Sequence, residues 1–169
     1  GRVARHQYIN DILWRAMHRA NIPAVKEPTG LSRTDGKRPD GMTMVPWQEG
    51  RAALWDVTVR DTLADSYIAS TSLLVGSAAK EAARQKEVKY SQLTGTYLFY
   101  AVAIETLGPM CESGRTFISE LGRRTAQVTS DQREISFLFQ RISVAVQRYN
   151  SVCIAGTFKA TASEPVDHG

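Results

Sequence analysis

The sequence predicts an α/β fold, with a small mixed sheet flanked by helices. Short apolar or alternating stretches, typical of strands, occur between longer amphipathic stretches, typical of helices. Their order is helix, strand, a hairpin of two strands, helix, strand and two helices, which suits helices layered on a sheet. The chain has 169 residues, enough for one domain with its own core. We expect residues 1–156 to form this domain and residues 157–169 to form a flexible tail.

The first helix is predicted over residues 5–20. Its apolar residues recur every three or four positions, as one buried face of a helix requires. Asn21 and Pro23 follow and should end the helix. Residues 24–27 are then expected to form a short strand.

A hairpin is predicted within residues 36–59, GKRPDGMTMVPWQEGRAALWDVTV. Each strand carries one aspartate, Asp40 and Asp56, among apolar or β-branched residues. A carboxylate in such surroundings is costly unless it is paired, hydrogen-bonded or metal-bound. Two carboxylates on paired strands therefore suggest a site for a hard divalent cation. Alternation along the second strand places Asp56 on the same face as Leu54 and Thr58.

The next helix is predicted over residues 77–93, a stretch with four alanines and neither Gly nor Pro. Lys86 and Lys89 share one helical face with Ala82 and Leu93. One interpretation is that the lysine stems pack and their ammonium groups reach solvent. The other is that one or both ammonium groups reach the two aspartates.

The rest of the chain should complete the sheet and its cover. The continuous apolar run over residues 97–105, YLFYAVAIE, suits a central strand covered on both faces. Two helices follow, over residues 114–127 and 131–155. Gly156 stands where a helix commonly ends. The apolar stripe of the last helix is expected to pack into the core.

Four short motifs occur in a recognisable order. They are Arg5-His6-Gln7, Arg38-Pro39-Asp40, the aspartate Asp56, and Lys86-x-x-Lys89-Tyr90. Together they resemble the restriction-like endonuclease domain of site-specific non-LTR retrotransposons, over roughly residues 1–93. This domain is of the PD-(D/E)xK type.

The chain departs from that family at two positions. Gln7 stands where the family has an asparagine, and Thr58 stands where PD-(D/E)xK nucleases have a lysine. Fifteen residues separate the two aspartates, slightly more than is typical of the family. A lysine for catalysis would then have to come from Lys86 or Lys89.

The resemblance implies a restriction-endonuclease-like core and a metal-dependent DNA endonuclease. Asp40 and Asp56, with the backbone carbonyl of Val57, would hold Mg²⁺, or Mn²⁺ in its place. Lys86 and Lys89 would be catalytic. Nucleic-acid contacts would come from four further residues: Arg5, His6, Lys37 and Arg38.

The resemblance also implies a biological setting. In that family the domain lies C-terminal to a reverse transcriptase and a zinc knuckle, and nicks nuclear DNA to prime reverse transcription. The implied partners are DNA, these upstream parts of the same polyprotein and the element RNA. No membrane partner is expected, since no run approaches about 20 apolar residues. The net charge of +4 modestly favours a polyanionic partner. The excess lies in residues 1–40, which hold eight Lys or Arg against four acids.

Two other interpretations stay open. A catalytically silent DNA-binding module would explain Gln7 and Thr58 as losses, although the two aspartates and two helix lysines would then have been kept without a use. An unrelated, metal-free α/β interaction domain would make Asp40 a turn residue and Asp56 a capping or salt-bridged acid. Carboxylates far apart, on opposite faces of the sheet, would favour this last interpretation.

Overall fold

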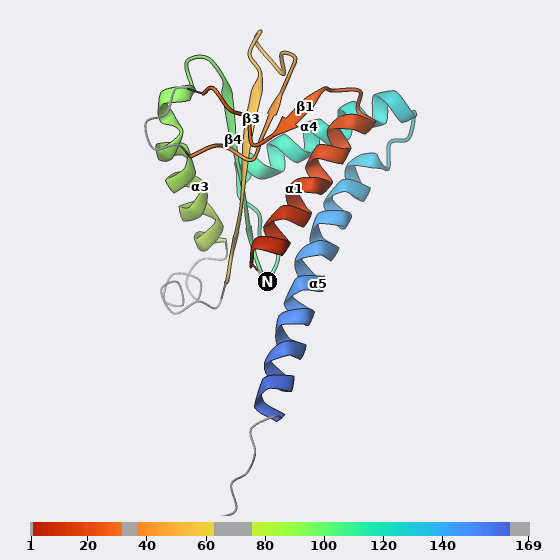
Figure 1. Ribbon diagram of the computed structural model, residues 1–169. Coiled ribbons are helices and arrows are strands. Elements are labelled where there is room, and N and C mark those ends of the chain that lie inside the picture. Colours follow the sequence, from red (N-terminus) through yellow and green to blue (C-terminus); the bar gives the residue numbers. More distant parts are fainter. Residues whose placement is uncertain (1, 32–36, 63–75, 163–169) are drawn as a thin grey trace, which may run out of the picture.

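The structure is a computed structural model, which describes residues 2–31, 37–62 and 76–162. The described chain is mixed α/β, with four α-helices and a four-stranded mixed sheet (Figure 1). The predicted fold class, a small mixed sheet flanked by helices, is confirmed. None of the described helices is both long and apolar enough to cross a lipid bilayer.

The sheet has the order β1-β2-β3-β4. Its strands are β1 (Ala24–Lys26), β2 (Gly41–Thr43), β3 (Ala53–Arg60) and β4 (Leu98–Glu105). The predicted hairpin is β2 and β3, which pair antiparallel, as do β1 and β2. The two long strands, β3 and β4, pair in parallel along their full length.

The position of β4 corrects one expectation. The apolar run over residues 97–105 was expected to be a central strand, but β4 lies at the edge of the described sheet. Both of its faces are nevertheless covered, because helices α3 and α4 both contact it. The continuous apolar pattern therefore reflects coverage of the two faces and not a place between two other strands.

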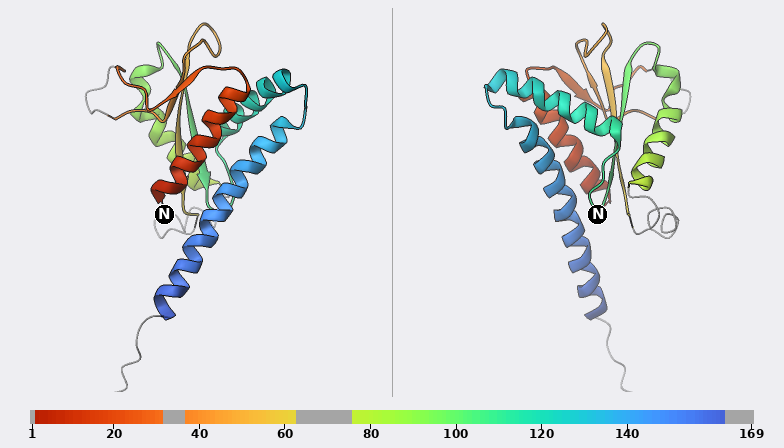
Figure 2. Two further views of the ribbon diagram at one scale, coloured as in Figure 1. Left: turned by 45° about the vertical axis from the view of Figure 1, so that its right-hand side comes forward. Right: turned by 180° about the vertical axis from the view of Figure 1, so that it is seen from behind.

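Helices cover the two faces unequally. Helix α3 (Ser77–Lys89) lies on one face, whereas α1 (Arg2–Arg19), α4 (Glu112–Thr129) and α5 (Glu134–Ala162) lie on the other (Figures 1 and 2). A short 3₁₀ turn, η1 (Ser91–Leu93), follows α3, so the predicted helix over residues 77–93 ends four residues earlier. Helix α1 ends close to the expected residue, where Asn21 adopts a left-handed φ of 56°.

The last helix is longer than predicted. Helix α5 continues to Ala162, so Gly156 does not end it and residue 156 is not a helix boundary. One glycine inside a helix costs only about 1 kcal/mol relative to alanine. Residues 163–169 of the predicted tail lie outside the described residues.

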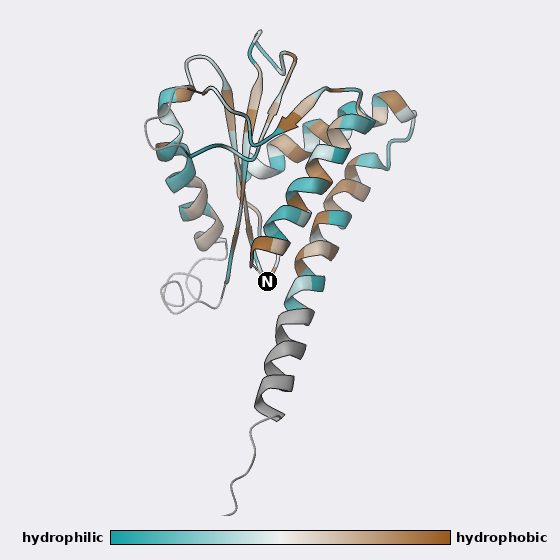
Figure 3. Cartoon of the chain, in the orientation of Figure 1, coloured by the Kyte–Doolittle hydropathy of each residue, from teal (hydrophilic) through white to brown (hydrophobic). Residues whose placement is uncertain are grey.

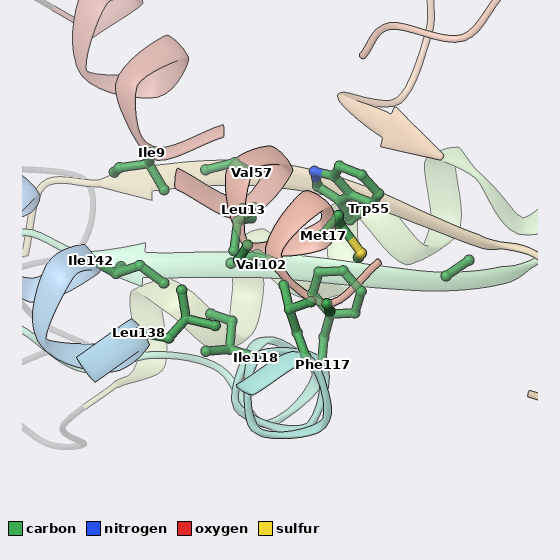
Figure 4. Close-up of a cluster of buried hydrophobic side chains, with 14 of the residues drawn as sticks. Ile9, Leu13, Met17, Trp55, Val57, Val102, Phe117, Ile118, Leu138 and Ile142 are labelled. Atoms are coloured by element: carbon green, nitrogen blue, oxygen red, sulfur yellow. The ribbon is translucent and has the colours of Figure 1, made fainter. Parts of the chain in front are cut away.

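The main core fills the face covered by three helices. Trp55 and Val57 of β3 and Val102 of β4 point into it, as Figure 4 shows. Helix α1 contributes Ile9, Leu13 and Met17, and α4 and α5 contribute Phe117, Ile118, Leu138 and Ile142. Figure 3 shows brown apolar segments alternating with teal hydrophilic ones along these helices, as expected of amphipathic helices.

The α3 face of the sheet is built from smaller side chains. Ala79, Ala82 and Ala83 of α3 pack on Ala101 and Ala103 of β4. Because neither surface carries bulky groups here, the helix can approach the sheet closely. Leu54 belongs to a separate small cluster beside η1, so β3 alternates between its two faces as predicted.

Candidate active site

Asp40 and Asp56 lie side by side at one edge of the hairpin. Register pairs Gly41 with Trp55 and Met42 with Leu54, which places Asp40 opposite Asp56 one step beyond β2. Residues opposite each other on antiparallel strands point their side chains to the same face. Both aspartates are buried, with 8% of Asp40 and 4% of Asp56 exposed. The arrangement expected of an unrelated domain, with carboxylates on opposite faces, is therefore not found.

The Asp40 carboxylate is held by two groups. The backbone N–H of Val57 donates to Asp40 Oδ2 at 2.6 Å, and His6 Nε2 lies 2.9 Å from the same oxygen. His6 comes from the first turns of α1, so helix packing connects it to a carboxylate 34 residues away. His6 thus belongs to the carboxylate site, whereas the sequence predicted only a contact with nucleic acid.

Val57 presents its peptide group to the same edge. Asp40 N–H donates to the carbonyl of Trp55 at 2.9 Å, so Trp55 directs its peptide group towards β2. Val57 lies two residues further on, and alternate residues of a strand direct their N–H and C=O groups to the same side. The Val57 carbonyl therefore points towards the edge where Asp40 lies.

Lys86 reaches Asp56 from the opposite element. It lies in the last turn of α3, and its Nζ is 2.7 Å from Asp56 Oδ2. The contact is a close ion pair, in which the ammonium group lies directly against the carboxylate oxygen. The interpretation that a helix lysine reaches the aspartates is correct for Lys86. Lys89 instead has its Nζ over the ring of Tyr90, 5.1 Å from the centroid.

The surroundings drive the pKa values of the two carboxyls apart. Burial, together with the charge and hydrogen bond of Asp40, raises the pKa of Asp56 to about 7, although Lys86 opposes this rise. Burial also raises the pKa of Asp40, but hydrogen bonds from His6, Asp56 and Val57 and the charge of His6 together lower it below its usual value. The pKa of His6 is raised, mainly by its hydrogen bond to Asp40. Such a pair of carboxyls with separated pKa values is typical of functional sites.

Asn10 is a residue of the site that the sequence did not single out. Its side-chain amide donates to the backbone carbonyl of Asp40 at 3.2 Å and accepts from Trp55 Nε1 at 2.7 Å. It is buried on α1, four residues after His6 and therefore on the same helical face. A polar residue one turn after His6, inside an otherwise apolar stripe, is the signal that could have identified it.

The predicted nucleic-acid contacts lie around this edge. Arg5 is half-buried near the start of α1, and Lys37 and Arg38 are exposed just before Asp40. Arg38 Nη1 donates weakly to the carbonyl of Glu27 at 3.4 Å. A hollow of about 700 Å³ has His6, Glu27 and Asp40 in its lining. Of the predicted basic residues, Arg38 lies beside this hollow through its contact with Glu27.

The donors at this edge are of the kind that Mg²⁺ takes. Among the described residues, no group of three or more His, Cys, Asp or Glu side chains is arranged to hold a metal ion. Magnesium commonly binds through one or two carboxylates, and completes its shell with waters and substrate phosphates. Two adjacent carboxylates and a backbone carbonyl on the same edge fit that requirement.

Comparison with known proteins adds no assignment. The sequence matches no protein-family model and has no significant match among curated proteins.

Proposed function

We propose that this protein is a metal-dependent endonuclease that nicks DNA by phosphodiester hydrolysis. One observation carries the proposal: Lys86, 30 residues beyond Asp56 and on a different element, has its ammonium group on the carboxylate that lies opposite Asp40. Two carboxylates and a lysine are the groups with which PD-(D/E)xK nucleases act, and here the lysine comes from a helix instead of position 58. A lysine can move between elements in this way because its long stem lets the ammonium group reach the same place.

The carboxylates and the Val57 carbonyl would hold Mg²⁺, or Mn²⁺ in its place. A bound cation supplies polarisation of the scissile phosphate and a water of lowered pKa. The raised pKa of Asp56 fits this role, since the carboxyl can keep a proton when no cation is present and lose it when one binds. His6 and Asn10 would keep Asp40 in position from α1.

Lys86 would act on the phosphate and on the attacking water. Its side chain is about one-quarter exposed, so the ammonium group is next to solvent as well as to Asp56. From there it can hold a non-bridging phosphate oxygen and offset the charge that develops during hydrolysis. Lys89 would assist by holding a neighbouring phosphate. Arg5, Lys37 and Arg38 would contact the DNA backbone, which gives affinity without sequence specificity.

The family resemblance extends the proposal to a biological role. The nick would expose a 3′ hydroxyl that primes reverse transcription of an element RNA, next to a reverse transcriptase and a zinc knuckle of the same polyprotein. The site of action would be nuclear. Since a zinc knuckle would supply much of the target recognition, the isolated chain should nick DNA with little sequence preference.

Nicking of supercoiled plasmid tests the proposal directly. Wild type with Mg²⁺ or Mn²⁺ should convert plasmid to the open circle, and EDTA should stop the reaction. Asp56→Asn should abolish nicking. Asp131→Asn removes the same charge from a partly exposed acid in the α4–α5 turn and should nick like wild type. Equal metal-dependent nicking by both variants would show that the assigned site is wrong.

The silent DNA-binding module remains the second candidate. In its favour, His6, Val57 and Lys86 already partner the two carboxylates without a cation. On that interpretation the wild-type protein binds DNA in a salt-sensitive manner and does not nick it with either metal. Adding Mg²⁺ would then leave the melting temperature of the protein unchanged.

A further inference from the structure

A basic groove of about 540 Å³ lies between α1 and α5, which run side by side and antiparallel (Figures 1 and 2). Four arginines line it: Arg15 and Arg19 from α1, and Arg141 and Arg148 from α5. No acidic side chain is among its lining residues. The positive charge of the groove is therefore balanced only by carboxylates that lie outside its lining.

The two pairs of arginines differ in how they are balanced. Arg15 forms an ion pair with Asp11 at 2.9 Å, and Arg19 forms one with Glu134. Within the part of the chain that the structure describes, Arg141 and Arg148 make no ion pair. These two are exposed and lie seven residues apart, so they point from the same face of α5. They are the groups most available to an incoming anion.

Exposed apolar groups alternate with these arginines. Tyr8 from α1 and Phe137 and Val144 from α5 also line the groove, and they are 42%, 37% and 60% exposed. A row of cations interleaved with aromatic rings is the arrangement that binds a single strand of nucleic acid, because phosphates meet the cations and unpaired bases stack on the rings. A duplex offers phosphates but keeps its bases stacked inside, so it would leave the aromatic groups unused.

The groove continues towards the candidate active site. Tyr8 lines both the groove and the hollow that contains Asp40 and His6. Its ring also lies against Tyr149 of α5, with centroids 5.8 Å apart. A strand that leaves Asp40 along α1 would therefore pass Tyr8 and enter the arginine groove.

We propose that the α1–α5 groove binds single-stranded nucleic acid. The position of the groove on the path of a cleaved strand rests on the proposed nuclease function, whereas the binding of a single strand by the groove does not. In a nicking reaction the groove would hold the strand segment that is unpaired next to the cut. Its affinity should depend on Arg141 and Arg148 and be independent of a metal ion.

Fluorescence anisotropy of the full 169-residue chain tests this proposal. The probe is a labelled single-stranded DNA of about 20 nucleotides, titrated in EDTA over a series of salt concentrations. Arg141→Gln with Arg148→Gln should weaken binding roughly tenfold or more at low salt. The slope of log K against log salt should become shallower by about 1.4, as expected for two lost contacts to a single strand. Phe137→Ala should weaken binding roughly tenfold and leave the slope unchanged, because it removes a stacking contact.

The matched control is Lys80→Gln with Arg115→Gln. These residues are exposed cations on α3 and α4, in a hollow that also contains Glu81 and Glu112. The control removes the same charge and should change affinity less than twofold. Equal losses in the two double variants would overturn the proposal, as would a wild type that does not bind the probe. Tighter binding of a duplex of the same sequence, with the same dependence on Arg141 and Arg148, would overturn the single-strand assignment.

The nuclease proposal and this one fail separately. Asp56→Asn should lose nicking and keep wild-type binding of the single strand. If wild type never nicks DNA but its binding of the single strand depends on the two arginines, the groove proposal is supported and the nuclease proposal is wrong. If nicking depends on Asp56 but binding of the single strand does not depend on the two arginines, the nuclease proposal is supported and the groove proposal is wrong.

Discussion

Asp56 is the residue on which the proposed chemistry and the pH-dependent stability of the site both depend. Its carboxyl is buried next to Asp40, and its pKa is raised to about 7. This value lies above that of an unfolded chain, so the protonated form favours folding. The stabilisation is fully present below about pH 4 and is lost as the pH rises through 7. Above that pH, the folded protein must hold two adjacent charged carboxylates.

Asp56→Asn should therefore raise the melting temperature in EDTA at pH 8, by several degrees, because the amide cannot ionise. At pH 5 the difference from wild type should be much smaller, since wild-type Asp56 is then protonated. Adding Mg²⁺ at pH 8 should stabilise wild type and leave the variant unchanged. Differential scanning calorimetry measures all three differences. A variant that melts lower than wild type at pH 8 would mean that the ion pair with Lys86 outweighs the repulsion from Asp40.

Replacing either of the two lysines of α3 should slow nicking, but to different extents. Lys86 lies 2.7 Å from Asp56, whereas Lys89 lies over Tyr90. Lys86→Met removes the ammonium group beside the carboxylates and should slow nicking by roughly 100-fold or more. Lys89→Met should slow it by less than roughly tenfold, since its part is to hold a phosphate. Initial rates of plasmid nicking under saturating Mg²⁺ provide the comparison. The opposite order of effects would assign catalysis to Lys89.

The hairpin is the element that brings Asp40 opposite Asp56, and its register depends on a close contact. A Cβ added to Gly41 would meet the Trp55 ring, at 1.9 Å from Cζ2. That ring is fully buried and hydrogen-bonded to Asn10, so it has no free space into which to move. The glycine therefore lets the two strands pair directly beside the largest side chain of the core.

Gly41→Ala should destabilise the protein by about 3 kcal/mol, through overpacking against Trp55. The nicking activity should fall with it, because a shifted β2 moves Asp40. Gly95→Ala is the control, since nothing lies within 4 Å of the added Cβ and its effect should stay within about 0.5 kcal/mol. Urea unfolding of both variants measures the difference. Equal midpoints would show that the hairpin can shift to admit a Cβ.

What the sequence predicted at this scale had local causes. Alternation on β3 and helical spacing on α3 placed Asp56 and Lys86 on facing surfaces, which is why their contact could be expected. The contact between His6 and Asp40 depends on how α1 packs on the sheet, and no spacing within the chain encodes that. The edge position of β4 depends on strand order, which an apolar run does not specify. The sequence pattern underestimates the length of α5, because Gly156 lies inside the helix at a cost of only about 1 kcal/mol.

In the whole molecule the two faces of the sheet differ in composition and in use. The face under α1, α4 and α5 carries the large apolar side chains, such as Trp55 and Phe117, and so contributes most of the hydrophobic stabilisation. The α3 face carries alanines, which let the helix approach β3 and β4 closely enough for Lys86 to reach Asp56. The candidate site thus lies where β2 ends beside β3, and takes one group from the helix on the alanine-rich face.

This division predicts which part of α5 the fold needs. The buried apolar residues of α5 in the described part are Leu138, Ile142, Ala145 and Val146, and Asn150 donates to the carbonyl of Thr106. All of them precede the stretch of α5 that extends beyond the rest of the molecule in Figure 1. Removal of residues 157–169 should therefore change the melting temperature by less than about 2 °C and leave nicking intact.

A deeper truncation gives the contrast. Ending the chain at residue 141 removes Ile142, Ala145 and Val146 from the main core and should prevent cooperative folding, because most of the apolar face that packs on α1 and α4 is lost. Thermal unfolding followed by circular dichroism distinguishes the two truncated chains. If the 156-residue chain melted about 10 °C lower or more, the final turns of α5 would have to contribute to the core. The domain boundary would then lie beyond residue 156, because the fold would need the helix up to Ala162 and the tail could begin only after it.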